Sequence, residues 1–382
     1  MMRRLLTGLL LLFATAGYSY ARLHTGLILS YDSYNKLRYG AELQYDHTPS
    51  ASSFYLGASA FTSGSAIAQV RYTRILPALG MDLSVKGGYF REKGEFFYGF
   101  NGYDTDASAV YNDDYYRLNR NTANVSVDLG GPIWRDLRWT VGYEFRYLQT
   151  GRFTGKDGDI PTLYDMLVAD GTILAEDAAG GRISMLRAGL SLDLRNDEDY
   201  TTSGVRADAE FRYAPAFLGT SHEFLGYRGL FSHWLPLVSD RLVLAYRLQA
   251  EGFVNDPAFY ALPYDDILSS GRVRGILRNR IQGRSVAFFN SELRYEALRL
   301  PLGSDHFRLV ACGIFDGGRV LVPFAAQSFT NEKMHLSAGA GIHVHLPGST
   351  VLTLEYVKPF RTEDSRRNSG RGIFYVHTGV FF

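Results

Sequence analysis

The ten residues RWTVGYEFRY, at positions 138–147, alternate polar and apolar side chains with a period of two. In an extended chain, arginine, threonine, glycine and glutamate fall on one face, and tryptophan, valine, phenylalanine and tyrosine on the other. Residues 205–213 and 241–251 repeat this pattern. A polar face opposite a face of large apolar side chains predicts strands of a sheet with one apolar environment.

Nearly every candidate strand in the chain carries the same alternation, and none is a continuous apolar run. In a soluble β-sandwich the polar face meets water and the apolar face packs on a second sheet. A single closed sheet, with lipid outside and a polar lumen, accounts better for a pattern shared by all strands. The sequence therefore predicts an all-β fold, a single transmembrane antiparallel β-barrel.

About sixteen segments qualify as strands, and single-chain outer-membrane barrels have an even number. The expected strands are 23–31, 38–45, 53–61, 66–74, 81–90, 120–129, 138–147, 182–194, 205–213, 223–234, 241–252, 285–296, 306–315, 334–346, 350–358 and 372–382. Short turns alternate with long connections near 91–119, 148–181, 253–284 and 359–371. Because these barrels have short periplasmic turns and longer outer loops, both chain ends are expected on the periplasmic side.

The N-terminus has the features of a secretory signal peptide. Arg3 and Arg4 precede a short apolar core, and Ala21 supplies a small residue at a cleavage site. The sequence predicts a signal peptide at residues 1–21 and one barrel domain at residues 22–382. No run of about twenty apolar residues follows, which excludes a transmembrane helix. We expect export to the outer membrane of a Gram-negative cell.

Charge and composition limit the partners. The formal net charge is +1, and removal of the two arginines of the signal peptide makes it −1. No surplus of positive charge remains to neutralise phosphates, so nucleic acid is excluded as a partner. The 26 tyrosines and 25 phenylalanines suit aromatic girdles at the two membrane interfaces, where outer-membrane lipid and lipopolysaccharide are the expected partners. The single cysteine, Cys312, excludes an intramolecular disulfide framework and a Cys-rich metal site.

Four motifs occur in order along the second half of the chain. They are Asp193-Leu194-Arg195-Asn196, Val273-Arg274-Gly275-Ile276, Asn290-Ser291-Glu292 and Asp316-Gly317-Gly318. Over residues 182–382 the chain resembles the barrel of the BamA/TamA superfamily, also called the bacterial surface antigen family. That family carries a Val-Arg-Gly-aromatic motif on a sixth outer loop that folds back into the lumen. Here Ile276 replaces the aromatic residue.

Two carboxylates are expected on the lumen side of adjacent strands. Alternation places Glu292 on the polar face of its strand, and Asp316 shares the polar face of the next strand with Cys312. An arginine in a confined lumen needs a carboxylate, and its planar fork suits two acceptors. As the resemblance implies, Arg274 pairs with Asp316 and Glu292 and pins the inward-folded sixth loop. The alternative is an ordinary Arg-rich outer loop that faces lipopolysaccharide phosphates.

The two ends of the barrel sequence must meet in a seam. The last expected strand ends in Phe382, with Gly379 three residues earlier, and a terminal aromatic residue resembles the sorting signal of outer-membrane barrels. Packing of Phe382 in the aromatic girdle is the plainer interpretation. Gly26 and Gly379 both lie in the seam, and glycine weakens a strand. One hypothesis is a seam that opens into lipid, and the other is a seam that stays closed.

The resemblance implies a role in outer-membrane protein assembly or translocation, or in lipid handling. The family carries periplasmic POTRA domains before the barrel, whereas here the first expected strand begins almost directly after the predicted cleavage site. We therefore expect a barrel without POTRA domains that works with periplasmic or outer-membrane partner proteins. The alternative is a passive pore or a structural subunit of an outer-membrane complex.

No constellation of catalytic residues is evident. The sequence lacks a G-x-S-x-G elbow and any Ser-His-acid grouping that resembles an outer-membrane phospholipase. The acidic cluster at 104–106 lacks the spacing of a calcium loop. His343 and His345 share a strand face, but a metal needs a converging third ligand, so we interpret them as polar lumen residues. We expect neither enzymatic activity nor a cofactor.

Overall fold

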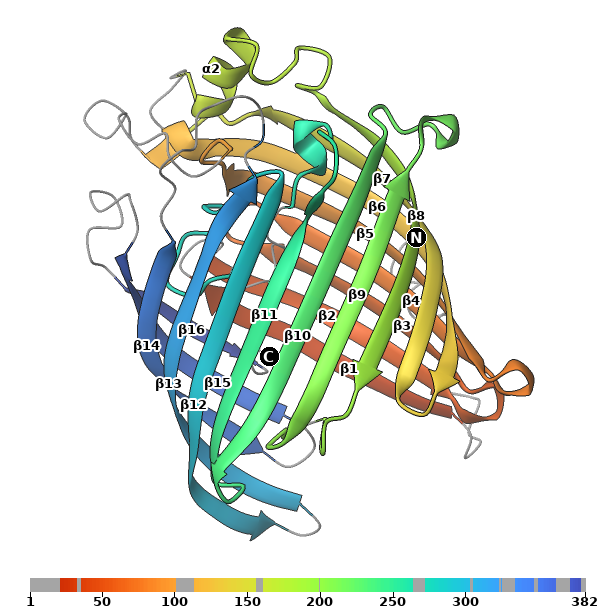
Figure 1. Ribbon diagram of the computed structural model, residues 1–382, viewed down its shortest axis with the longest axis vertical. Coiled ribbons are helices and arrows are strands. Elements are labelled where there is room, and N and C mark those ends of the chain that lie inside the picture. The colour runs from red at the N-terminus through yellow and green to blue at the C-terminus, as the bar shows by residue number, and fades with distance from the viewer. Residues whose placement is uncertain are drawn as a thin grey trace, which may run out of the picture.

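In the described part of the chain, sixteen strands form one closed antiparallel barrel, in which each strand pairs with its neighbours in sequence and β1 pairs with β16 (Figure 1). The computed structural model describes residues 21–32, 36–100, 113–155, 161–198, 200–263, 272–302, 305–322, 324, 334–346, 350–361 and 372–378. The predicted fold class and strand number are confirmed. The predicted signal peptide lies outside the described residues, apart from Ala21.

Each predicted strand has its counterpart in the barrel. The strands are β1 Ala21–Asp32, β2 Lys36–His47, β3 Ser52–Phe61, β4 Ala66–Leu76, β5 Met81–Phe96, β6 Arg117–Trp134, β7 Leu137–Arg152, β8 Gly180–Asp193, β9 Gly204–Ala214, β10 Phe224–Val238, β11 Leu242–Phe253, β12 Ser285–Leu302, β13 Asp305–Val322, β14 His335–Leu346, β15 Thr350–Arg361 and β16 Ile373–Thr378. No helix among the described residues is long and apolar enough to cross a membrane.

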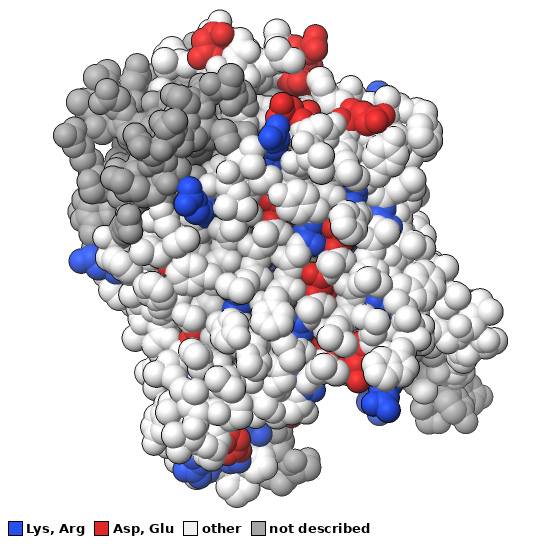
Figure 2. All heavy atoms as spheres, in the orientation of Figure 1, with Lys and Arg blue, Asp and Glu red and all other residues white. Residues whose placement is uncertain are grey.

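The alternation that predicts the barrel separates its two faces. In β7, Val141 and Tyr143 are exposed on the outside, while Glu144 is only 3% exposed and faces the lumen. Figure 2 shows that much of the visible wall carries no charged side chain, and that acidic side chains gather at the end with the long connections. An apolar outer wall around a polar interior is the arrangement that a lipid bilayer requires of a barrel.

Several strands are longer than the sequence predicts, notably β5, β6 and β7 in the first half and β12 and β13 in the second. β12 and β13 each span 18 residues, and their ladder continues from Ser285–Val322 down to Leu302–Asp305. Residues 297–305, between the strands predicted at 285–296 and 306–315, are therefore mostly strand. Leu298, Leu300 and Leu302 explain the extension of β12, because they continue the apolar outer face to the end of the barrel opposite the long connections.

The long outer connections were predicted as loops, yet one of them contains a short helix, α2 Leu163–Ala169. Thr162 begins it with a capping box, since its hydroxyl accepts the Asp165 N–H and Asp165 in turn accepts the Thr162 N–H. α2 lies at the top of Figure 1 beside the other long connections. The capping motif Thr-x-x-Asp that begins this helix is present in the sequence of the predicted loop.

The tyrosine-rich connection after β5, predicted from the sequence as one of the long outer loops, is packed at both of its described flanks. Phe97, Phe100 and Tyr115 are at most 3% exposed. They join one apolar cluster with Leu163 of α2 and Phe259 of the sixth loop. The aromatic residues of three separate connections therefore build a cap at the outer mouth of the barrel. The sequence analysis did not predict this cap, because the middle of the first connection is polar.

Candidate functional site

The sixth outer connection re-enters the barrel with residues 272–284. Val273 and Ile276 are at most 3% exposed, and the Ile276 N–H donates to the Val273 carbonyl at 3.2 Å to close a turn. Gly275, in this turn, has a φ of +79°, a conformation that favours glycine. A Cβ atom there would also lie 3.0 Å from Val357 on β15. The glycine of the motif therefore lets the loop backbone approach the barrel wall.

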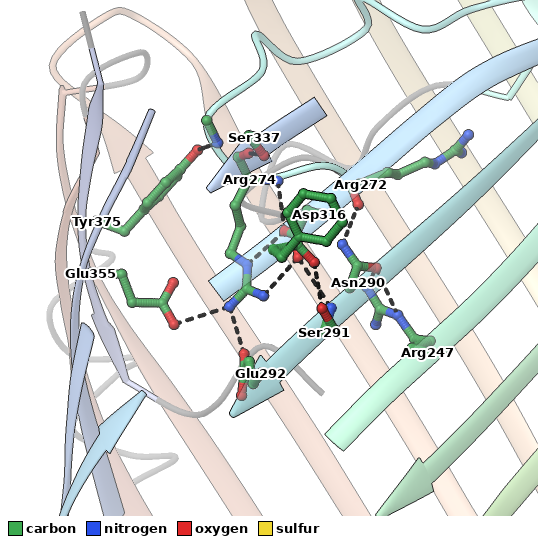
Figure 3. A network of polar contacts seen from close by, with 12 residues as sticks. Arg247, Arg272, Arg274, Asn290, Ser291, Glu292, Asp316, Ser337, Glu355 and Tyr375 are labelled. Carbon is green, nitrogen blue, oxygen red and sulfur yellow. Dashed lines mark hydrogen bonds and ion pairs between the residues drawn. The ribbon is translucent and has the colours of Figure 1, made fainter. Parts of the chain in front are cut away.

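The guanidinium group of Arg274 contacts three carboxylates of the wall (Figure 3). Its Nε and Nη2 donate to the two oxygens of Asp316 at 2.8 and 3.0 Å. Its Nη1 donates to Glu292 at 2.5 Å and to Glu355 at 3.1 Å. These carboxylates come from β13, β12 and β15. Glu292 and Asp316 thus lie where alternation and the resemblance predict them, and Glu355 is a third partner that the sequence analysis missed.

This ion cluster is buried. The side chains of Arg274, Glu292, Asp316 and Glu355 have no exposed surface. Burial alone lowers the pKa of the loop residue Arg274, but Glu292 and Asp316 outweigh it, and the pKa lies well above its ordinary value. Charges taken out of water are stable only with close partners, and removal of one member leaves the others unpaired at a high cost.

Neutral contacts fix the loop backbone beside the ion cluster. The Gly275 N–H donates to the hydroxyl of Tyr375 on β16 at 3.0 Å, and Ser337 on β14 donates to the Arg274 carbonyl. Asn290 on β12 donates through Nδ2 to the carbonyl of Arg272 at 2.9 Å. The loop is therefore attached to five consecutive strands, β12 to β16, through one short segment.

A second ion cluster attaches the same loop to β5, on another part of the barrel wall, and includes a residue of β6. Arg278 donates to Glu92 at 2.8 Å, and Asn279 donates to Glu95 at 2.8 Å. Arg120 on β6 contacts both glutamates, at 3.1 and 2.8 Å. All five side chains are buried. The loop therefore spans the lumen between two groups of strands, a feature that the sequence analysis did not identify.

Apolar side chains pack beneath the motif. Val273, Ile276 and Ile281 of the loop form one buried cluster with Phe288 on β12 and with other wall residues. A Cβ atom at Gly318 would come 2.6 Å from Phe288 and 2.9 Å from Val273, so only glycine leaves this space to the loop. Ile276, the departure from the family motif, fills an aliphatic site, and each such buried side chain contributes about 1.5–3 kcal/mol.

Asp193 and Asn196 do not join the loop. Asp193 accepts two hydrogen bonds from Arg195, and Asn196 accepts the backbone N–H of Thr202 at 3.0 Å in the turn between β8 and β9. Tyr200 of that turn is 8% exposed, and its ring lies 4.9 Å from that of His345 on β14. These two residues therefore order a turn that reaches into the periplasmic end of the lumen.

The predicted sorting-signal residues Gly379 and Phe382 lie outside the described residues. The seam itself is partly described. The six residues of β16 pair with β15 at six positions, from Leu352–Thr378 to Val357–Ile373. Within the described residues, β16 pairs with β1 at one position, Tyr31–Val376. β16 therefore lies between β15 and β1 and closes the barrel.

Comparison with known proteins gives one family. An Omp85 superfamily domain matches residues 77–382. No curated protein sequence matches the chain significantly. Among solved structures, BamA from Haemophilus ducreyi lacking POTRA domains 1–3 is similar at a TM-score of 0.65 and 16% identity, over 94% of this chain and 70% of that one.

Two CdiB structures are also similar. CdiB from Escherichia coli matches with a TM-score of 0.62 and 12% identity, over 93% of this chain and 62% of that one. CdiB from Acinetobacter baumannii matches with a TM-score of 0.55 and 14% identity, over 94% and 60% of the two chains. This chain thus spans 60–70% of the length of the three solved chains, and the similarity at this identity concerns the barrel fold.

Proposed function

This chain belongs to the Omp85 superfamily, and we propose that it assembles membrane proteins in the outer membrane of a Gram-negative cell by opening its β1–β16 seam toward lipid. Partner proteins deliver the clients, and lipid and lipopolysaccharide surround the barrel. The observation that carries the proposal is the attachment of the sixth loop to β16, the strand that closes the barrel against β1, through the bond between Gly275 and Tyr375.

When β1 separates from β16, its free edge can accept another strand. β1 pairs with β2 at twelve positions, from Ala21–His47 to Asp32–Lys36, so its other side is the one that contacts β16. Leu27 on β1 is 90% exposed. Unpaired backbone N–H and C=O groups at a sheet edge bind an added strand by main-chain hydrogen bonds. A client strand of an unfolded barrel carries the same groups.

The loop favours this function over a passive pore. Its two buried ion clusters and the aromatic cap occupy the lumen and the outer mouth of the barrel. The loop holds β16 from inside through the bond between Gly275 and Tyr375. A barrel whose last strand is held in place can open its first strand and still keep its shape. We propose that residues 1–21 direct export, as the positive and apolar segments suggest.

Reversible disulfides test the proposal. Tyr31→Cys with Val376→Cys locks the seam, and Leu354→Cys with Val376→Cys locks β15 to β16 as a matched control, because Val376 pairs with both residues. Both pairs are made in a Cys312→Ser background. The readout is conversion of an added unfolded outer-membrane protein to its heat-modifiable folded form in vesicles that contain the barrel and its co-purified partners.

We expect the seam lock to reduce client folding to the level of empty vesicles, and a reductant to restore it. The control lock leaves the rate unchanged. Equal rates for the oxidised and reduced seam lock would contradict opening of the seam. An unchanged folding rate together with accelerated transfer of labelled phospholipid, abolished by the lock, would assign the seam to lipid handling instead.

A further inference from the structure

A group of three chemically different side chains lies on the lumen face of β13, β14 and β15. They are Cys312, His343 and Glu355, and their donor atoms all lie within 4.8 Å of one another. Three neighbouring strands supply one residue each. Cys312 pairs with Gly341, and Gly341 pairs with Glu355, so the thiol and the carboxylate face each other across β14. His343 follows Gly341 by two residues on β14, and its imidazole reaches the same group.

The spacing of these atoms matches a first coordination sphere. The Cys312 Sγ lies 3.4 Å from the His343 Nε2, and that nitrogen lies 3.1 Å from a Glu355 oxygen. Ligands at tetrahedral angles around zinc, with ordinary Zn–S, Zn–N and Zn–O distances, are separated by about 3.6 Å for sulfur and nitrogen and about 3.4 Å for nitrogen and oxygen. The two observed separations are therefore within a few tenths of an ångström of these values, and all three donor atoms lie within 4.8 Å of one another.

The cluster is enclosed but has polar atoms without partners. His343 and Glu355 are at most 1% exposed, and Cys312 is 4% exposed. The His343 Nδ1 and the Glu355 Oε2 have no hydrogen-bond partner within the described residues. Gly341 leaves the space between the ligands open, since a Cβ atom there would lie 2.7 Å from the Glu355 Cγ and 3.1 Å from the Cys312 Sγ. Buried polar atoms of this kind ordinarily bind water or an ion.

Charged side chains surround the cluster in balanced numbers. The three carboxylates of Glu292, Asp316 and Glu355 lie around Arg274, Arg294 pairs with Glu292, and Arg247 interacts electrostatically with Asp316 and Glu292. The Glu355 Oε1 near the imidazole also accepts from Arg274, whereas its Oε2 has no hydrogen-bond partner among the described residues. A divalent ion at the cluster meets a thiol that can lose its proton, an imidazole nitrogen and a carboxylate oxygen.

We propose that Cys312, His343 and Glu355 form a binding site for a borderline-soft divalent cation, of which Zn²⁺ is the best match. Sulfur, nitrogen and oxygen together are the ligands zinc takes, and three protein ligands leave a fourth position for water. Binding releases the Cys312 thiol proton to solvent and forms the metal–thiolate bond. The ion joins β13, β14 and β15 next to the Arg274 cluster and so stabilises that part of the wall.

Cobalt provides the probe, because a tetrahedral Co²⁺–thiolate site has intense charge-transfer and d–d absorption. The folded barrel in detergent, reduced and stripped of metal, is titrated with Co²⁺ and then with Zn²⁺, and bound metal is counted by mass spectrometry. The variants are Cys312→Ser and His343→Ala. His345→Ala is the matched control, since His345 is also a buried lumen residue of β14 but lies outside the cluster. Heat-modifiable migration in gels verifies that each variant is folded.

We expect one Co²⁺ per chain with a thiolate band that Zn²⁺ displaces. His343→Ala weakens zinc binding by at least about tenfold, since even loss of a group that supports a ligand costs ten- to a hundredfold. His345→Ala binds like the wild type, and Zn²⁺ slows alkylation of Cys312 by a maleimide in both. Absence of a thiolate band in the wild type, or equal zinc affinity in the wild type and the His343→Ala variant, would overturn the proposal. If Cys312→Ser does not fold, the His343→Ala comparison still decides.

Discussion

Two parts of the barrel wall differ in what lies against their lumen faces. On the braced wall, β12 to β15, the inward side chains Glu292, Asp316, Ser337 and Glu355 are at most 1% exposed. On the open wall, β1 to β4, inward side chains such as Glu42 and Arg71 are exposed, although Ser59, Phe61 and Ile67 near the β3–β4 turn are buried. Hydrogen bonds and ion pairs join residues 272–279 of the sixth loop to β5 and to β11 to β16. The loop therefore supports one wall and not the whole circumference.

This difference indicates where the barrel can move. Local opening occurs most easily where few buried contacts must be broken. The braced wall has to lose paired buried charges before its strands separate, whereas β1, across the seam from β16, belongs to the open wall. Tyr375 lies at the border between the two, because it belongs to the seam strand β16 and also holds the loop. The barrel thus combines a fixed side with a side suited to strand exchange.

The largest effect is expected from removal of Arg274, the guanidinium group at the centre of the ion cluster on the braced wall. Arg274→Ala leaves Glu292, Asp316 and Glu355 without their shared guanidinium, and removal of one partner from a buried pair costs about 3–5 kcal/mol. Urea unfolding of the folded barrel in vesicles measures this loss. We also expect larger and noisier conductance in planar bilayers, since the loop no longer holds its place in the lumen.

Arg71→Ala is the matched control on the open wall. Arg71 is exposed and its guanidinium carbon lies 5.5 Å from the centre of the Tyr55 ring, an interaction worth about 0.5–1 kcal/mol. Its removal is expected to leave the conductance unchanged. Similar losses of stability in the Arg274 and Arg71 variants would remove the distinction between the two walls.

A smaller effect is expected at the second attachment of the loop. Arg278→Ala removes one partner of Glu92, but Arg120 still contacts both Glu92 and Glu95. The remaining pair limits the cost to about 1–3 kcal/mol, the range for a buried polar group that loses one partner. The measurement is again urea unfolding. A loss equal to that of Arg274→Ala would mean that β5 and β6 belong to the braced wall as much as β12 to β15.

The smallest change in stability is expected from Tyr375→Phe. This variant loses only the hydrogen bond from the Gly275 N–H, which contributes about 0.5–1.5 kcal/mol. Its informative readout is hydrogen exchange at the β16 amides, which we expect to become faster while exchange in β12 stays unchanged. Unaltered exchange in β16 would show that the loop does not hold the seam strand.

The strand pattern was predictable because every strand has lipid on one side and the lumen on the other. All sixteen strands were found, with the largest errors at the C-terminal ends of β5, β12 and β13. Alternation also placed Glu292 and Asp316 on the lumen face, and the family resemblance supplied Arg274 as their partner. The same alternation marks Glu355 as an inward residue of β15, between the outward residues Leu354 and Tyr356. The inward position of Glu355 could therefore have been predicted from the sequence.

The second attachment was not predictable in this way. Glu92 and Glu95 are three residues apart, so a regular strand would point them to opposite faces. Both are buried inside because the register of β5 shifts between them, at Lys93 and Gly94, where Gly94 has a φ of +67°. A bulge of this kind redirects side chains and has no pattern of its own beyond the glycine. Arg278 lies 186 residues from Glu92, and nothing local links the two.

The most direct test of the two-wall account is hydrogen–deuterium exchange of the wild-type barrel in lipid vesicles, followed strand by strand. The account predicts slow exchange throughout β12 to β15 and the fastest exchange of any strand in β1 and β16. It also predicts that Arg274→Ala raises exchange in β12 to β15 toward that of the seam. Equal protection of β1, β16 and β13 in the wild type would contradict the account.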